Sequence, residues 1–211
     1  MAASLTLEER TSSLLMLGDP ALRVESNDVS EELFGSERLR ALALDMTDVL
    51  RAAGGLGLAA PQIGASLRVL LMEVADDRRY PGTPKMPLTC LINPIVVSLT
   101  SETEEAYEGC LSLPGLRGPV SRVTALRVDA RDVEGAQVAL RLSGAFARVL
   151  LHELDHLDGI LYFDRIAPSD LPRFGFKDAL EAAGIDLSLS RSAPAEWEPL
   201  SPPRTREAER S

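Results

Sequence analysis

The chain has 211 residues, of which 45% are hydrophobic and 26% are charged, a balance typical of one globular domain with its own core. Its formal net charge of −10 argues against nucleic-acid duplexes and anionic membranes as main ligands, because both attract clustered lysine and arginine. No apolar run approaches the roughly 20 residues of a membrane helix, and the N-terminus has no secretory signal pattern, so a cytoplasmic location is expected.

The first part of the chain predicts an irregular start, one amphipathic helix and a glycine-rich loop. Residues 1–35 contain only short helical or turn-like pieces. A helix is predicted over 36–53, where Ser36 can cap the first turn and the apolar residues form one stripe. In the next segment, 55–64, Pro61 and three glycines exclude a regular helix or a central strand.

Apolar runs and alternating patterns predict β-strands in the middle of the chain. The predicted strands cover residues 67–74, 88–100 with an interruption at Asn93, 123–131 and 136–142. The last two form a hairpin, in which Leu126, Val128 and Ala130 face one side and charged residues face the other. A polar, proline-rich loop is predicted over 76–87.

A second helix is predicted over 144–158, with Ser143 as a candidate cap and Gly159 as its stop. A short third helix is predicted over 177–183. Because the strands precede the second helix rather than alternating with helices, the predicted fold class is α+β.

The chain is expected to form one catalytic domain over 1–187, followed by a tail over 188–211. The tail is rich in serine, proline, arginine and glutamate, so it is expected to be disordered and to be dispensable for activity. One feature of the tail argues for docking onto the domain, because Trp197 can cover an apolar patch.

The second helix carries the pattern of a metal site. His152 and His156 are four residues apart, so both imidazoles lie on one face and can bind one ion. Glu153 follows the first histidine, where a carboxylate can hold a water without binding the metal. These are the only two histidines in the chain, and the pattern predicts a catalytic metal centre.

A catalytic metal usually has three protein ligands and one open position, so a third ligand must come from elsewhere. A downstream glutamate, Glu181, is one candidate. Cys110 is the stronger candidate, because it lies in a turn-rich motif, whereas the other cysteine, Cys90, lies in an apolar strand pattern.

Three short segments carry distinctive patterns: the glycine-rich stretch 55–64, Glu108-Gly-Cys-Leu-Ser112 and His152-Glu-Leu-Asp-His156. Together, and in this order, they resemble the three signatures of the peptide deformylase family. The resemblance extends over about residues 14 to 166. It implies a metal-dependent hydrolase that removes the formyl group from the N-terminal formyl-methionine of nascent polypeptides and releases formate.

The resemblance also implies roles for individual residues. Cys110, His152 and His156 resemble the metal ligands, and Glu153 resembles the general base and acid. Gln62 resembles the side-chain donor to the oxyanion, assisted by the backbone N–H of Leu111. The implied cofactor is one divalent ion, Fe²⁺ in the first place, with Zn²⁺, Ni²⁺ or Co²⁺ able to replace it. The implied fold is a compact domain with antiparallel strands around the metal-binding helix.

Three glycines are expected to serve substrate binding, namely Gly55, Gly57 and Gly109, because a peptide can approach their backbone and pair as an added strand. Val149 is a candidate for the wall of a methionine slot. Many family members have glutamine where this chain has Leu151, and altered packing or altered hydrogen bonding around the metal ligands is expected there, rather than lost chemistry. The expected partners are N-formyl-methionyl nascent peptides and the ribosome near its exit tunnel, without direct DNA or membrane binding.

Two other functions would use some of the same residues. A zincin-type endopeptidase would share the two histidines and Glu153 but gives no reason for Gln62 and Cys110 to occur in these motifs. A non-enzymatic metal-binding module needs neither a base nor an oxyanion donor. Both alternatives therefore explain fewer of the residues than a deformylase does.

Overall fold

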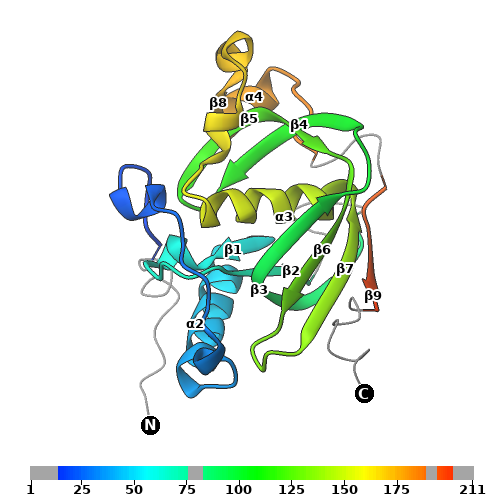
Figure 1. Cartoon of the computed structure of the whole chain (residues 1–211). Helices are drawn as coiled ribbons and strands as arrows, with labels where there is room; N and C mark the ends of the chain where they lie inside the picture. Colours follow the sequence, from blue (N-terminus) through cyan, green and yellow to red (C-terminus); the bar gives the residue numbers. More distant parts are fainter. Residues whose placement is uncertain (1–13, 76–82, 189–193, 202–211) are drawn as a thin grey trace.

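The computed structural model describes residues 14–75, 83–188 and 194–201. Its main helix, α3 (Gly144–Leu157), lies between two antiparallel sheets, which confirms the α+β class and the strands around a central helix (Figure 1). The larger sheet has six strands in the order β1 (Gly57–Ala59), β2 (Val69–Val74), β3 (Met86–Ser98), β6 (Ala125–Arg131), β7 (Gln137–Ser143) and β9 (Glu196–Leu200). The smaller sheet has three, in the order β4 (Thr103–Cys110), β5 (Leu113–Val123) and β8 (Gly175–Phe176).

The larger sheet is covered by a helix on each face. Along β2, Leu70 and Met72 join the core that includes α3, whereas Val69 and Leu71 join the core that includes α2 (Glu37–Ala53). Successive side chains of a strand point to opposite faces, so burial on both faces explains the continuous apolar run of β2. A third cluster lies under the smaller sheet and includes Cys110.

The ends of the two main helices match the predictions only in part. Ser36 caps α2 by accepting a hydrogen bond from Leu39 N at 3.2 Å, as expected. Ser143 is the N-cap residue of α3, as predicted, but its side chain makes no capping hydrogen bond, because its hydroxyl donates to the carbonyl oxygen of Pro194 at 2.8 Å. Gly159, with φ of +70°, follows the end of α3 as predicted.

The structure contains more β-strand than the sequence pattern predicts, at β3 and in the segment that contains β4 and β5. β3 is one strand from Met86, two residues earlier than predicted, and the interruption at Asn93 is a register shift between Ile92 and Ile95. The hairpin of β4 and β5 was not predicted at all, because its glycines and prolines suggested turns. Cys110 therefore ends a strand, immediately before the short connection to β5.

The expected disorder from residue 188 onward needs correction. β9 pairs with β7 along five registered residue pairs and closes that end of the larger sheet (Figure 1). Trp197 packs against the core around α3, and its Nε1 donates to the carbonyl oxygen of Lys85 at 3.0 Å. The exposed backbone edge of β7 supplies the pairing, so a polar segment needs few apolar residues to be ordered there. Residues 189–193 and 202–211 lie outside the described residues.

The short third helix is also present, as α4 (Lys177–Ala182), beside the smaller sheet. The described part of the chain also contains five 3-10 helices: η1 (Pro20–Arg23), η2 (Glu31–Leu33), η3 (Ala60–Ile63), η4 (Tyr162–Arg165) and η5 (Pro168–Arg173). None of the helices in the described ranges has both the length and the apolar character needed to cross a lipid bilayer.

Candidate active site

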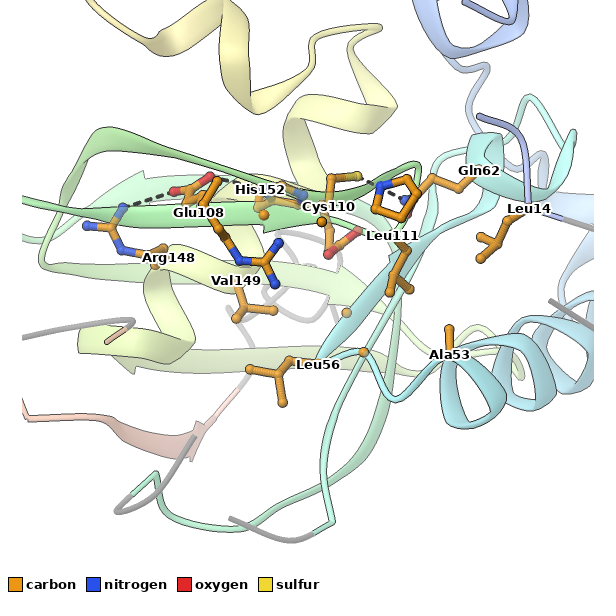
Figure 2. A pocket seen from close by; sticks show the side chains of 17 residues that line it. Leu14, Ala53, Leu56, Gln62, Glu108, Cys110, Leu111, Arg148, Val149 and His152 are labelled. Atoms are coloured by element: carbon orange, nitrogen blue, oxygen red, sulfur yellow. Dashed lines mark hydrogen bonds and ion pairs between the residues drawn. The ribbon is translucent and has the colours of Figure 1, made fainter. Parts of the chain in front are cut away.

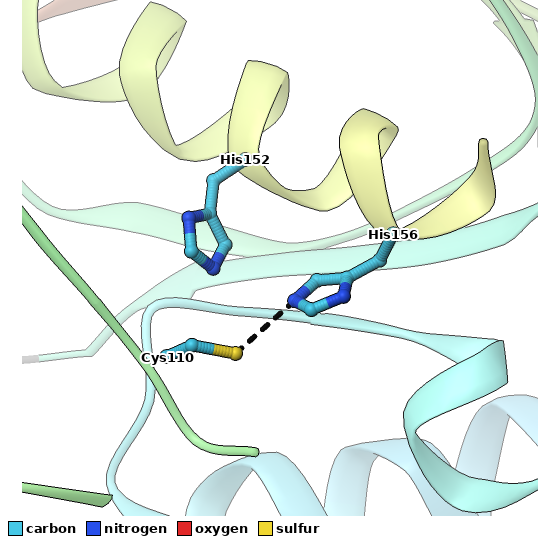
Figure 3. A group of neighbouring side chains, drawn as sticks. All are labelled: Cys110, His152 and His156. Carbon is cyan, nitrogen blue, oxygen red and sulfur yellow. Dashed lines mark hydrogen bonds between the residues drawn. The ribbon is translucent and has the colours of Figure 1, made fainter. Parts of the chain in front are cut away.

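Three side chains suited to metal binding meet between α3 and the end of β4. Cys110, His152 and His156 are all buried, and their candidate ligand atoms lie within 4.8 Å of one another (Figure 3). Sγ of Cys110 is 3.2 Å from Nε2 of His156. Sulfur and nitrogen ligands around one tetrahedral zinc-sized ion lie about 3.5 Å apart, so the cluster fits a single ion. The alternative candidate, Glu181, instead forms an ion pair with Lys177 on α4.

A buried glutamate orients the first histidine. Oε2 of Glu108 is 2.9 Å from Nδ1 of His152, which leaves Nε2 of that ring to face the cluster. Glu108 also accepts two hydrogen bonds from Arg122 and one from Arg148, each of 2.9 Å. Burial opposes ionisation of Glu108, but the hydrogen bonds and charge of Arg122 outweigh burial and hold its pKa well below the usual range. A carboxylate behind a ligating histidine is a common support of metal sites.

The thiol of Cys110 is placed to ionise. Burial opposes the thiolate, but the charge of His156 and hydrogen bonds from both histidines outweigh burial and lower the pKa of Cys110 well below its usual value. Cys90 behaves in the opposite way, because burial raises its pKa to about 12. The two cysteines therefore differ in chemistry as the sequence suggested, one reactive and one packed.

Glu153 has the surroundings of a proton carrier. Its side chain is buried, and its Oε2 has no hydrogen-bond partner among the described residues. Burial raises the pKa of Glu153 to about 7, although the neighbouring His152 and His156 act in the opposite direction. A carboxyl group with a pKa near neutral pH can both accept and return a proton. A Cβ atom on Gly57 would lie only 2.4 Å from Oε1 of Glu153, so the absence of a side chain there makes room for this carboxylate.

Gln62 presents its amide nitrogen to the same cluster. It lies in η3, where its Oε1 accepts a hydrogen bond from Ala59 N at 2.9 Å. Its Nε2 is 3.5 Å from Sγ of Cys110 and 3.2 Å from Oγ of Ser112. Because Ala59 N can only donate, the end of the amide that it contacts must be the oxygen. Nε2 is therefore the end that faces Cys110 (Figure 2). Leu111 follows Cys110 directly and lies in the same wall.

These groups line one cavity of about 290 Å³. The cavity wall contains eight of the nine expected site residues, and the ninth, His156, completes the cluster behind it. The apolar part of the wall includes Leu14, Ala53, Leu56, Leu111 and Val149 (Figure 2). Val149 is therefore where helical position predicted it, whereas Leu14 and Ala53 were not predicted because no local pattern marks them.

The three glycines expected to bind substrate lie where the chain packs closely against other residues. A Cβ atom on Gly55 would lie 2.9 Å from a methyl group of Leu111, and one on Gly109 would lie 2.1 Å from the guanidinium of Arg117. Together with Gly57, they keep the cavity open between β1 and β4, each of which ends its sheet on that side. Leu151, which precedes the first histidine on α3, is half-buried and packs against the core.

Sequence reasoning missed the polar residues that support the site. Glu108 was noted only as part of a motif, and its partners Arg122 and Arg148 lie 14 and 40 residues further along the chain. Ser112 was likewise noted only as a motif member. Helix and strand periodicity relates only residues that are close in sequence, so only the folded structure shows that these residues are neighbours.

Comparison with known protein sequences finds similarity to peptide deformylases. The sequence profile of the family described as "Polypeptide deformylase" matches residues 11–171. "Peptide deformylase 1" of Nitrosomonas europaea is 47% identical over 167 residues, which are 79% of this chain and 93% of that protein. "Peptide deformylase 1" of Prochlorococcus marinus is 45% identical over 178 residues, which are 84% of this chain and 91% of that protein.

The solved structures that resemble this chain are also peptide deformylases. A class I type b peptide deformylase from Acinetobacter baumannii, described with Met-Ala-Ser bound, has a TM-score of 0.71 and 33% identity, over 79% of this chain and all of that one. A peptide deformylase from Thermotoga maritima has a TM-score of 0.65 and 35% identity, over 74% of this chain and 97% of that one.

Proposed function

The chain belongs to the polypeptide deformylase family, whose members remove the formyl group from the N-terminus of nascent peptides, and from this membership we propose how its own residues carry out the reaction. Cys110, His152 and His156 hold one divalent metal ion. The single observation that carries this assignment is their buried convergence beside Glu153 and Gln62 in one cavity. A thiolate with two imidazoles suits borderline-soft ions, and we propose Fe²⁺, with Zn²⁺, Ni²⁺ or Co²⁺ as replacements.

A divalent ion in this position supplies Lewis acidity, which lowers the pKa of water toward neutral pH. Glu153 takes the proton of the attacking water on the carboxylate oxygen that has no partner among the described residues. It then returns that proton to the departing amine, so the amide bond is replaced by formate and a free amino group. The raised pKa of Glu153 suits both transfers at neutral pH.

The formyl oxygen gains negative charge as the water attacks. We propose that Nε2 of Gln62 and the backbone N–H of Leu111 donate hydrogen bonds to it. Both residues line the cavity next to Cys110, and Nε2 is already turned toward the sulfur. Donors that are in place before the reaction stabilise this charge without reorganisation, and losing one typically costs roughly 10²–10³ in rate.

The substrate is proposed to be a peptide that begins with formyl-methionine. Gly55, Gly57 and Gly109 let its backbone approach β1 and β4, and the apolar part of the wall near Leu56 and Val149 receives the methionine side chain. The peptide Met-Ala-Ser bound to the Acinetobacter relative supports this substrate class. We further propose action on ribosome-bound chains near the exit tunnel, in the cytoplasm, by a catalytic domain whose larger sheet includes β9.

The test is formate release from formyl-Met-Ala-Ser by anaerobically purified protein, with metal analysis of the same sample. The proposal expects one metal ion per chain and release that stops after chelation and returns with Fe²⁺. Acetyl-Met-Ala-Ser serves as the matched control, because a tight formyl site should reject the larger acyl group. Equal hydrolysis of both peptides, or cleavage of internal peptide bonds, would contradict the proposed substrate.

A further inference from the structure

Ser112 lies beside the proposed oxyanion donor and has no part in the mechanism above. It is fully buried, with 0% exposure, in the connection between β4 and β5. It is not among the residues that line the cavity. Its hydroxyl oxygen accepts a hydrogen bond from Nε2 of Gln62 at 3.2 Å. Any effect of this hydroxyl on the reaction must therefore pass through Gln62.

The amide of Gln62 is held at both ends. Its Oε1 accepts from Ala59 N at 2.9 Å, and its Nε2 donates to Ser112 at 3.2 Å. A primary amide nitrogen carries two hydrogens. Since Ser112 engages one of them, the other is left for the side of Cys110, 3.5 Å away, where the formyl oxygen is proposed to bind.

We propose that Ser112 is a positioning residue, whose hydroxyl fixes the Gln62 amide so that its second N–H is aimed at the formyl oxygen before the reaction begins. The inference rests on the proposed oxyanion role of Gln62. The bonds with Ala59 and Ser112 define the orientation of the amide plane, whereas without Ser112 the end that carries Nε2 keeps only its longer contact of 3.5 Å with Sγ of Cys110. A donor that has to be reoriented during the reaction stabilises the developing charge less than a fixed one.

The N-terminal segment holds the two motifs in the same relation. Leu15 N donates to the carbonyl oxygen of Gln62 at 2.8 Å, and Leu17 N donates to the carbonyl oxygen of Ser112 at 2.9 Å. Ser112 N is also 3.4 Å from Sγ of Cys110, as a donor. The backbone of Ser112 is thus fixed by contacts that do not involve its hydroxyl. Removing the hydroxyl therefore tests the side-chain contact alone.

The first experiment measures Ser112→Ala in the metal-loaded full chain. The expected result is a fall of about tenfold in kcat with KM within about twofold, a part of the roughly 10²–10³ lost with a whole oxyanion donor. Ser26→Ala is the matched control, because Ser26 is also buried but its hydroxyl has no hydrogen-bond partner among the described residues. Metal content and melting temperature are measured for both variants. Unchanged kcat per bound metal in Ser112→Ala, with only a lower melting temperature, would overturn the positioning role.

The second experiment separates this inference from the role of Gln62. In a Gln62→Ala background, Ser112→Ala is expected to have no further effect on kcat, and additive losses would refute action through the amide. In the zinc-loaded protein, the side-chain amide protons of Gln62 should exchange faster with solvent in Ser112→Ala than in the parent chain. If Gln62→Ala lowers kcat but Ser112→Ala does not, only the positioning role fails. If Gln62→Ala leaves kcat unchanged, the oxyanion role fails and the inference fails with it.

Discussion

Replacing Glu108 by glutamine tests the buried charge network that holds the first histidine. The two carboxylate oxygens of Glu108 receive hydrogen bonds from Arg122 and Arg148 and contact Nδ1 of His152. Glutamine keeps the shape but has one oxygen, and its NH₂ group would face donors rather than acceptors. It also leaves two buried guanidinium groups with less negative charge around them.

The burial of Glu108 and its partners determines how much stability Glu108→Gln is expected to lose. The side chains of Glu108 and Arg122 are 3% and 7% exposed, and breaking such a buried pair by removing one partner costs about 3–5 kcal/mol. Losing a carboxylate behind a ligating histidine should also weaken metal binding by about 10–100-fold. Because the fold lowers the pKa of Glu108, its contribution is present above the unfolded carboxyl pKa and is lost only as the pH falls toward the lower folded value. The loss should therefore be constant around neutral pH.

The control is Glu105→Gln on the same strand. Glu105 pairs with Arg173, and their side chains are 39% and 41% exposed, so losing this pair should cost at most about 1 kcal/mol. The assays are urea unfolding and metal release to a competing chelator, run on both variants and the parent chain. Equal losses in the two variants would refute the view that burial of the Glu108 network, rather than simple charge pairing, supports the site.

The remaining predictions concern catalysis, the metal and the tail. Glu153→Ala should abolish formate release while the metal is retained, and metal loss in the same sample would point to a ligand or folding role instead. Cys110→Ser should weaken metal binding far more than Cys90→Ser, which should affect mainly stability; equal affinities in a chelator competition would remove Cys110 as a ligand. Trp197→Ala should lower the free energy of unfolding by about 1–3 kcal/mol, less than for a fully buried tryptophan, because this one packs on the core but stays half-exposed. An unchanged free energy of unfolding would show that the packing of the Trp197 side chain does not stabilise the domain.

Local geometry explains what could be predicted from the sequence. His152 and His156 are one helical turn apart wherever the helix lies, so their spacing alone indicated a shared ion. The cap of α2 depends on Ser36 and the residue three positions later, and it was predicted correctly. Both cases depend on contacts within a few residues, which the helix geometry determines without reference to the rest of the molecule.

Tertiary structure decided the features that depend on distant partners. The hairpin of β4 and β5 forms despite its glycines and prolines, because each strand supplies the hydrogen-bond partners of the other. Ser143 is at the N-cap of α3, but its hydroxyl bonds elsewhere because the chain some 50 residues later brings the carbonyl of Pro194 to it. β9 is ordered for the same reason, since the edge of β7 offers it a backbone to pair with.

In the active site, too, some features depend on nearby residues and others on distant ones. The sequence by itself determined which residues carry the chemistry, because ligand and base must share one turn of helix and the motifs lie in short segments. It did not determine that Glu108 stands behind His152 or that Ser112 meets Gln62, contacts that join residues 44 and 50 positions apart. Buried polar groups must find partners wherever the chain brings them, and the free energy of leaving one unpaired selects among global arrangements rather than local ones. Those partners therefore become visible only once the whole chain is folded.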